Sequence, residues 1–488
     1  MNIMNFKPSV LLVLMLLWAG SSSAQVINEE TFKIGRTLSL IDAFYVDTVN
    51  LPRIAEKIIV NMLHDLDPHS TYISAKDVKE MNEPLIGNFE GIGIQFNILN
   101  DSIIVIEPIA GGPSQKAGLR AGDRIVAING ENVAGKGIST TGVRSKLMGK
   151  KGTTVALNIA RKGEKSLLDF TIIRDKIPIN SIDAAYMLDK ETGYVKLSRF
   201  AATTSGEFQK SVDSLKKNNM KNIVIDLRSN GGGYMMAATD LSNKFFSDKN
   251  LLVYLIGRKT PRQDYFSSGK GPLASSRVVV LTDESSASAS EIFAGAIQDW
   301  DRGVIIGRRT FGKGLVQNGY YLTDGSMIRL TIARYFTPTG RSIQSPYNEG
   351  YDKYVENFYK RYSAGEMVSA DSVHFPDSLK FKTLVNKRIV YGGGGIMPDV
   401  FVPVDTSGYS DYLRAIVRKG VESTFILEYS DRNREKILKQ YKTFDQFKAN
   451  FSFTKDEINS FIKKAESSGI KYDEKQYQIS EKEILMRL

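Results

Sequence analysis

The sequence of 488 residues contains no cysteine and only three histidines. Without cysteine the chain can hold no disulfide, zinc–thiolate site, thiol redox centre or cysteine nucleophile. Three histidines leave little room for a metal site built from imidazoles. The chemistry must therefore come from hydroxyl, amine, carboxylate or backbone groups, and we expect neither a metal nor a cofactor.

Long apolar runs are also missing. The apolar run at residues 10–19 follows Lys7 and precedes small residues that end at Ala24. About ten apolar residues cannot cross a hydrocarbon layer of about 30 Å. A basic residue, a short apolar run and small residues together predict a signal peptide at residues 1–24, cleaved after Ala24. We therefore expect an exported protein, periplasmic or associated with the cell envelope, with no stable membrane span.

The formal net charge is +11, which in a cytosolic protein would favour nucleic acid as a partner. In an exported protein this charge suits an anionic cell envelope better, so no nucleic-acid partner is expected. With 42% hydrophobic and 24% charged residues, the composition is that of a globular protein, and the length predicts about three domains. No sequence signal indicates an oligomeric state.

Changes of pattern divide the remaining chain into four regions. Residues 25–87 carry apolar side chains at helical spacing and predict a helical region. Residues 88–175 show short β segments with glycine turns, and residues 176–405 alternate strands with helices. Residues 406–488 are charged and helical, without a catalytic motif. His64 and His69 lack the i, i+4 spacing of a zinc-binding helix, so we assign them a structural role.

The second region resembles a PDZ domain. Strands are predicted at 91–96, 103–108 and 122–130, with a short helix at 112–118 and an Asn-Gly turn at 129–130. The resemblance rests on "GIGI" at 91–94 and "AGLRAGDRIVAINGENV" at 117–133. It implies that the backbone N–H groups of this loop hold a peptide's terminal carboxylate while the peptide adds a strand. The peptide-binding residues would be Gly91, Ile92, Gly93 and Ile94; the alternative is a small β domain without a ligand.

The third region contains three apolar strands, at 222–228, 277–282 and 303–307, each followed by a polar or glycine-rich loop. If a helix at 288–300 joins the last two as a right-handed βαβ unit, these strands run parallel. Their loops would then meet at the carboxyl edge of one sheet, where α/β proteins place their sites. The glycines at 231–233, the serines at 285–290 and Lys313 would converge there.

A serine at a helix N-terminus is placed for nucleophilic attack, because first-turn N–H groups face a developing oxyanion. The alternative is that the Ser/Ala run only caps and packs the helix. Residues 176–350 contain no histidine and no G-x-S-x-G motif, so a Ser-His-Asp triad within this region is excluded. The remaining base is lysine, which serves only where burial lowers its pKa from about 10.4 toward neutrality. Lys313, between two glycines, is the candidate.

A nucleotide-binding loop is the competing interpretation of the same segment. Residues 307–313 match G-x-x-x-x-G-K, but Gly314 occupies the position that should be Ser or Thr for magnesium. The sequence that follows is typical of a strand, whereas a P-loop opens a helix. Nucleotide binding is therefore disfavoured.

The chain resembles the carboxyl-terminal processing peptidases (tail-specific proteases) of the serine–lysine type. The matching segments appear in the family's order across most of residues 40–405: "DPHSTYIS", the PDZ region, "VIDLRSNGGG", "DESSASASEIFAGAIQDW", "GRRTFGKGLVQ", "YFTPTGRSIQ" and "GGGIMPDV". The resemblance implies Ser288 as nucleophile, Lys313 as general base and Gln317 as the residue that orients the lysine amine. It also implies oxyanion donors at the N–H groups of Gly232 and Ala289.

The sequence departs from the family pattern at two places. Gly231 stands where the family usually has proline, and residues 346–392 separate the last two motifs. The resemblance implies a mixed α/β serine–lysine protease core with an inserted PDZ domain and helical regions at both ends. The expected partners are protein or peptide substrates with accessible C-termini. Two alternatives remain open: a non-catalytic PDZ-bearing binding protein of the same fold, and an esterase or transpeptidase that acts on cell-wall material.

Overall fold

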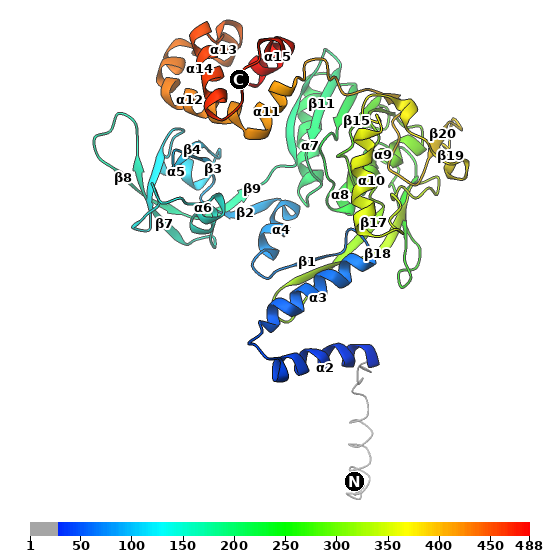
Figure 1. Ribbon diagram of the computed structural model, residues 1–488. Helices are drawn as coiled ribbons and strands as arrows, with labels where there is room; N and C mark the ends of the chain where they lie inside the picture. Colours follow the sequence, from blue (N-terminus) through cyan, green and yellow to red (C-terminus); the bar gives the residue numbers. More distant parts are fainter. Residues whose placement is uncertain (1–27) are drawn as a thin grey trace, which may run out of the picture. The chain divides into compact units, whose positions relative to one another are not determined.

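The computed structural model describes residues 28–488, so the predicted signal peptide lies outside the described residues. The chain divides into two units, residues 1–66 and 67–488. The described part of the first unit consists of α2 (Glu29–Phe44) and α3 (Leu51–Leu66) (Figure 1). Asn28 caps α2, because its side-chain oxygen accepts the backbone N–H of Thr31 at 2.8 Å. Both helices agree with the helical spacing of their apolar residues.

A six-stranded sheet forms the centre of the second unit. Its strands, in spatial order, are β10 (Ile182–Met187), β11 (Thr192–Leu197), β12 (Asn222–Asp226), β15 (Val278–Thr282), β16 (Val304–Gly307) and β21 (Val400–Phe401). All neighbours pair in parallel except β10 and β11. The predicted parallel arrangement of the three apolar strands is thus confirmed, and α9 (Ala289–Asp299) connects β15 to β16.

Helices α7 (Thr204–Lys217), α8 (Met235–Asn243) and α9 pack with this sheet in one apolar core. On α7, Phe208, Val212 and Leu215 are buried at i, i+4 and i+7, which is one face of a helix. Helix α9 is buried along its whole length. The core therefore holds the N-terminus of α9 rigidly at the carboxyl edge of the sheet.

A second sheet of the core collects strands from distant parts of the sequence. It contains β1 (Thr71–Ile73), β13 (Leu251–Ile256), β14 (Gln263–Phe266), β17 (Leu315–Tyr321) and β18 (Met327–Phe336). We expected residues 25–87 to be helical, but Thr71–Ile73 is a strand that pairs antiparallel with β18. Helix α4 (Val78–Ile86) follows it. A segment of three residues is too short to show an alternation of apolar and polar side chains, and its partner strand β18 lies about 250 residues later in the chain, so the sequence alone does not predict this strand.

The PDZ region forms a separate sheet with two helices, coloured cyan in Figure 1. Its strands are β3 (Ile94–Leu99), β4 (Ser102–Pro108), β5 (Arg124–Ile128), β6 (Glu131–Asn132), β7 (Thr154–Ala160) and β8 (Leu168–Ile173), and its helices are α5 (Pro113–Ala117) and α6 (Thr140–Leu147). The chain enters through β2 (Asn88–Gly91) and leaves through β9 (Asp175–Pro178), which pair antiparallel. This pairing is what an inserted domain requires.

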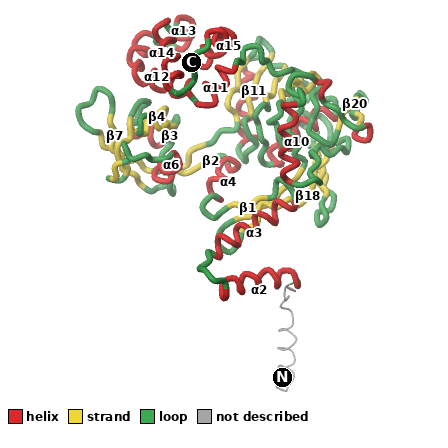
Figure 2. Tube along the Cα trace, in the orientation of Figure 1, coloured by secondary structure: helices red, strands yellow, loops and turns green. Residues whose placement is uncertain are grey.

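The rest of the chain is mainly helical, as Figure 2 shows. Residues 346–392 contain α10 (Tyr351–Ser363), the 3₁₀ turns Ala370–Ser372 and Asp377–Leu379, and the hairpin β19 (Lys380–Lys382) and β20 (Ile389–Tyr391). The C-terminal helices are α11 (Asp411–Lys419), α12 (Val421–Gln440), α13 (Phe444–Asn450), α14 (Lys455–Ser467) and α15 (Glu474–Arg487). They enclose an apolar core of their own. Within residues 28–488 we find no helix with the length and apolarity to cross a membrane.

Candidate active site

Ser288 lies at the N-terminal end of α9, directly after the loop that follows β15. Its φ of 56° is in the left-handed region, which few non-glycine residues adopt. The neighbouring serines are fully buried and their hydroxyls are committed: Ser286 donates to the carbonyl of Leu227 at 2.8 Å, and Ser290 donates to the carbonyl of Asn230 at 2.9 Å. Ser288 is half-buried and faces a groove. Of these three serines, Ser288 alone lines that groove.

Glu291 ties the serine to the loop that carries the lysine. Its carboxylate is completely buried, and one oxygen accepts the N–H groups of Ser288 at 2.8 Å and Lys313 at 2.9 Å. The other oxygen accepts the N–H of Gly312 at 2.8 Å and the hydroxyl of Thr310 at 2.5 Å. Burial raises the pKa of Glu291 to about 7, against the opposing effect of these donors. One side chain thus fixes the backbone at both predicted catalytic positions.

Lys313 lines the same groove as Ser288 and is half-buried. Its Nζ donates to Oε1 of Gln317 at 3.0 Å. Burial, with the nearby positive charge of Arg329, lowers the pKa of Lys313 below its ordinary 10.5. Among the described residues no carboxylate lies within ion-pair distance of the lysine; Asp67 and Glu291 favour its charged form from farther away, but burial and Arg329 outweigh them.

Gln317 is itself oriented by the segment just before β1. Its amide Nε2 donates to the backbone carbonyl of His69, which leaves Oε1 directed toward Lys313. The ring of His69 packs edge-on against Tyr354, and its Nε2 lies 3.2 Å from the tyrosine hydroxyl. Burial and the charge of Lys313 lower the pKa of His69 to about 4, so the ring is neutral at neutral pH. The predicted structural role of His69 is consistent with this arrangement.

Tyr335 adds a second bridge between the serine and lysine segments. Its hydroxyl lies 2.7 Å from the carbonyl oxygen of Lys313 and 3.1 Å from that of Ser288, so its one hydrogen is shared between these two acceptors, with Lys313 the nearer. The side chain is 1% exposed and comes from β18. Glu291 and Tyr335 therefore hold the backbone N–H groups and the carbonyls, respectively, of the same two residues.

The predicted oxyanion donors lie on either side of Ser288. Ala289 is the first residue of α9, so its N–H has no acceptor within the helix. Gly232 has a φ of +98°, and a Cβ at this position would lie 2.8 Å from Cβ of Ser288 and 2.6 Å from the carbonyl oxygen of Ala287. Its N–H donates to Oδ1 of Asn230 at 2.9 Å. As an oxyanion donor, Gly232 would have to exchange that bond for one to the substrate.

The groove has a volume of about 590 Å³ and brings these residues to one surface. Its lining includes Gly232, Ser288, Lys313, Gln317 and Tyr335. The lining also includes apolar side chains, namely Met235, Ile292, Leu315 and Val316. Within residues 28–488 we find no group of three or more His, Asp or Glu side chains that could hold a metal ion. The site offers a hydroxyl, an amine and backbone N–H groups, which suit acyl transfer.

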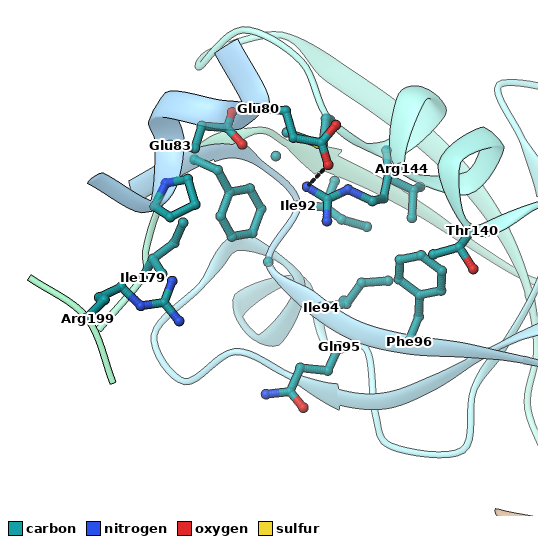
Figure 3. Close-up of a pocket in the computed structure, with 16 residues that line it drawn as sticks. Glu80, Glu83, Ile92, Ile94, Gln95, Phe96, Thr140, Arg144, Ile179 and Arg199 are labelled. Carbon is teal, nitrogen blue, oxygen red and sulfur yellow. Dashed lines mark ion pairs between the residues drawn. The ribbon is translucent and has the colours of Figure 1, made fainter. Parts of the chain in front are cut away.

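A second groove lies on the PDZ sheet, between the edge strand β3 and helix α6. Gly91, Ile92, Gly93 and Ile94, the four residues predicted to bind peptide, all line it. Figure 3 shows Phe96 next to Thr140 and Ile92 next to Arg144, so the strand and α6 both contribute to the lining. Strand β3 pairs only with β4, so its other edge is open to an added strand.

The sequence did not single out Glu291 or Tyr335. For Glu291 a signal was present, because Ser288 and a glutamate three residues later form the S-x-x-E pattern of a helix start. Tyr335 sits within the quoted motif "YFTPTGRSIQ", but nothing in its local pattern indicates that its hydroxyl spans two distant segments.

Comparison with known proteins places this site in a family. A model described as Peptidase family S41 matches residues 191–350, a PDZ domain model matches residues 91–172, and a family of unknown function matches residues 412–488. The chain is 34% identical over 341 residues to the carboxy-terminal-processing protease of Bartonella bacilliformis, an alignment that covers 69% of this chain and 77% of that relative. The chain belongs to the carboxy-terminal processing protease family.

Other members align over a similar part of the chain. The carboxy-terminal processing protease CtpB of Bacillus subtilis is 35% identical over 314 residues, which cover 64% of this chain and 65% of that relative. The match thus spans slightly less than two thirds of that relative's length. Among solved structures, the photosystem II D1 C-terminal processing protease matches with 25% identity and a TM-score of 0.39, covering 78% of this chain and 95% of that one. The resemblance read from the motifs is confirmed, as is the fold class of a mixed α/β core with a PDZ domain and C-terminal helices.

Proposed function

We propose that this protein is an exported serine endopeptidase that recognises polypeptide C-termini through its PDZ domain and cleaves peptide bonds with a Ser288–Lys313 dyad. The observation that supports the proposal is the groove that Ser288 and Lys313 share, in which Gln317 orients the lysine amine and no carboxylate lies within ion-pair distance of it among the described residues. The domains would be the signal peptide at 1–24, a helical region at 25–87, the PDZ domain at 88–175, the peptidase core at 176–405 and a helical extension at 406–488.

In the first step, neutral Lys313 takes the proton of the Ser288 hydroxyl as Oγ attacks the scissile carbonyl carbon. The carbonyl oxygen gains the negative charge, which the N–H groups of Ala289 and Gly232 would stabilise. The tetrahedral intermediate collapses, and the lysine ammonium returns its proton to the leaving amine. An acyl-enzyme on Ser288 and a free amine product result.

In the second step, the same lysine, neutral again, removes a proton from a water molecule that attacks the acyl-enzyme. The lysine then returns the proton to Oγ of Ser288 as the ester breaks, which releases the carboxylic acid product. The amine of Lys313, which donates a hydrogen bond to Gln317, must be neutral at the start of both steps. Its lowered pKa supports this role.

The PDZ groove would select the substrate. A peptide that lies along the open edge of β3 forms backbone hydrogen bonds with it, and its terminal carboxylate reaches the glycine-containing loop at residues 91–94. The apolar lining by Ile92, Ile94 and Phe96 favours an apolar C-terminal side chain. Substrates would therefore be proteins or peptides with accessible C-termini.

The rival function is that of a non-catalytic PDZ-bearing binding protein, and a further one is an esterase or transpeptidase. A binding protein has no use for an oriented amine beside a groove-facing serine. The test is digestion of casein and of a quenched fluorescent peptide by wild type, Ser288→Ala and Ser285→Ala. Ser285 is exposed on the same loop and serves as the matched control.

We expect Ser288→Ala to lose activity to below about 1% of wild type, as removal of a nucleophile does, while Ser285→Ala remains active. An inactive wild type that still binds peptides would favour the binding protein. Activity retained by Ser288→Ala would refute the dyad.

A further inference from the structure

The active-site groove is lined by two arginines and Lys313, and by no acidic side chain. The arginines are Arg199, two residues after β11, and Arg329 on β18. No aspartate or glutamate lines this groove. Asp67 and Glu291 act on Lys313 from outside this lining, so the two arginines are the lining charges that a negative group of a ligand would meet.

Arg199 lacks partners for its charge. Among the described residues its guanidinium forms no ion pair, and its Nε is buried without a hydrogen-bond acceptor. A guanidinium without a carboxylate partner keeps its capacity for charge-assisted hydrogen bonds to a ligand. Arg199 also lines the PDZ groove, and Figure 3 shows it beside Ile179 at the edge of that cavity. The acids of the PDZ groove do not neutralise it, because Glu80 pairs with Arg144 at 3.1 Å and Glu83 forms no ion pair with Arg199.

Arg329 is half-buried and touches only neutral acceptors. Its guanidinium donates to Oδ1 of Asn82 at 3.0 Å and to the carbonyl of Met81 at 3.3 Å. Burial lowers the pKa of Arg329, as expected of a cation that has lost water without gaining a counter-ion. Its charge also acts on Lys313. Arg329 is therefore close to the reacting groups as well as open to the groove.

We propose that Arg199 and Arg329 form a cationic subsite that binds a carboxylate of the peptide substrate near the scissile bond. Guanidinium groups match carboxylates in geometry and bind them through charge-assisted hydrogen bonds. The inference deepens the proposed peptidase function and rests on it. It assigns a substrate class, peptides with an acidic group beside the cleaved bond, to a site whose other lining is apolar or neutral.

The carboxylate could come from an Asp or Glu side chain or from the free C-terminus of a short tail. Quenched peptides separate these sources. One set places Glu or Gln, one at a time, at each of the three positions on either side of the scissile bond. A second set has Gln throughout and ends three residues after the bond, with a free or an amidated C-terminus.

The readout is the kcat/KM of the acidic peptide divided by that of the neutral peptide, measured with the same enzyme variant. A mutation that slows the chemical step equally for both peptides leaves this ratio unchanged. We expect wild type to favour the acidic peptide at one position, or the free terminus, by about tenfold to a hundredfold. Arg199→Gln and Arg329→Gln should each reduce that ratio toward one. Arg277→Gln, an exposed arginine of the core outside both grooves, should leave it unchanged.

Binding measured by calorimetry with Ser288→Ala keeps the test independent of turnover. Should wild type cleave no peptide, the peptidase proposal fails, but the acidic peptide should still bind the Ser288→Ala protein more tightly than the neutral one. Equal treatment of acidic and neutral peptides in both assays would overturn the subsite. So would a preference that survives in both arginine variants.

Discussion

Lys313 carries the sharpest consequence at the scale of single residues. Only its neutral amine can accept a proton, so kcat/KM should rise with pH through the pKa of this group. Because burial and Arg329 lower that pKa, the rise should occur below 10.5, the ordinary value for lysine. A pH–rate profile of wild type tests this.

Variants around Lys313 refine the same measurement. Lys313→Arg should be inactive at any workable pH, because a guanidinium stays protonated. Gln317→Ala should be slower but active, since it removes an acceptor that orients Nζ at 3.0 Å and leaves the base in place. Arg329→Gln should move the rise to higher pH, because it removes a positive charge beside the amine. Near-normal activity of Lys313→Arg would exclude lysine as the base.

Glu291 gives a second prediction at this scale. Glu291→Gln replaces one of the two carboxylate oxygens by an NH₂ group. If the NH₂ group takes the place of Oε2, the N–H groups of Ser288 and Lys313 lose their acceptor; if it takes the place of Oε1, the N–H of Gly312 loses its acceptor. At least one buried N–H is left without an acceptor, which costs about 1–3 kcal/mol of folding free energy. The loss of alignment should lower kcat/KM by about a hundredfold.

Activity assays and urea unfolding of Glu291→Gln measure both effects. Glu349→Gln, an exposed glutamate outside both grooves, is the control and should change neither quantity strongly. Full activity of Glu291→Gln would show that the carboxylate does not position the site.

The sequence predicts the candidate nucleophile and base of the site, whereas it does not predict the residues that support them. Ser288, Lys313 and Gln317 stand in recognisable motifs, and the residue types alone indicate a nucleophile and a base. The bond from Gln317 to the carbonyl of His69 joins residues 248 positions apart and uses a backbone group, which no motif records. The uncompensated charge of Arg199 likewise depends on which side chains are absent from a cavity, and that is visible only in three dimensions.

At the scale of elements, helix α9 connects the active site to a buried ion pair at its far end. Arg341 and Asp299 are both fully buried, with 2.6 Å between guanidinium and carboxylate, and Gln298 accepts from the same guanidinium nitrogen at 2.7 Å. Removing one partner leaves the other charge buried and without a counter-ion. Arg341→Leu should therefore lower the free energy of unfolding by about 3–5 kcal/mol.

Chemical denaturation of this variant should be compared with that of Lys221→Leu, which breaks the exposed pair with Glu191. The exposed pair should contribute less than about 1 kcal/mol. Equal losses in the two variants would mean that the buried pair adds no more stability than a surface pair.

Element prediction succeeded where local pattern and pairing agree. The valine- and isoleucine-rich segments at 222–228, 277–282 and 303–307 predict buried strands, and the helix between the last two fixes their parallel direction. Thr71–Ile73 was assigned to a helical region because three residues carry no period, and only pairing with β18 makes them a strand. Long-range pairing is the information that a local pattern lacks.

At the scale of the whole molecule, the proposed function requires one polypeptide substrate to occupy both grooves. If the PDZ groove holds the C-terminus, amidation of a substrate's C-terminal carboxylate should weaken its cleavage, mainly by raising KM. Matched free and amidated peptides with a tail long enough to reach the loop at 91–94 test this. Ile94→Asp, which places a negative charge in the groove, should remove the difference between them, whereas equal turnover by wild type would exclude this role of the PDZ domain.

The supports of the active site also set when the protein can become active. The carbonyl of His69 orients Gln317, Asn230 holds Ser290, and the segment before Lys313 is bonded to Ile396 through Thr310. A ribosome must therefore have delivered almost 400 residues before the lysine loop has all its partners. No shorter nascent chain contains the complete catalytic geometry. We therefore expect proteolytic activity only from chains that extend past Ile396.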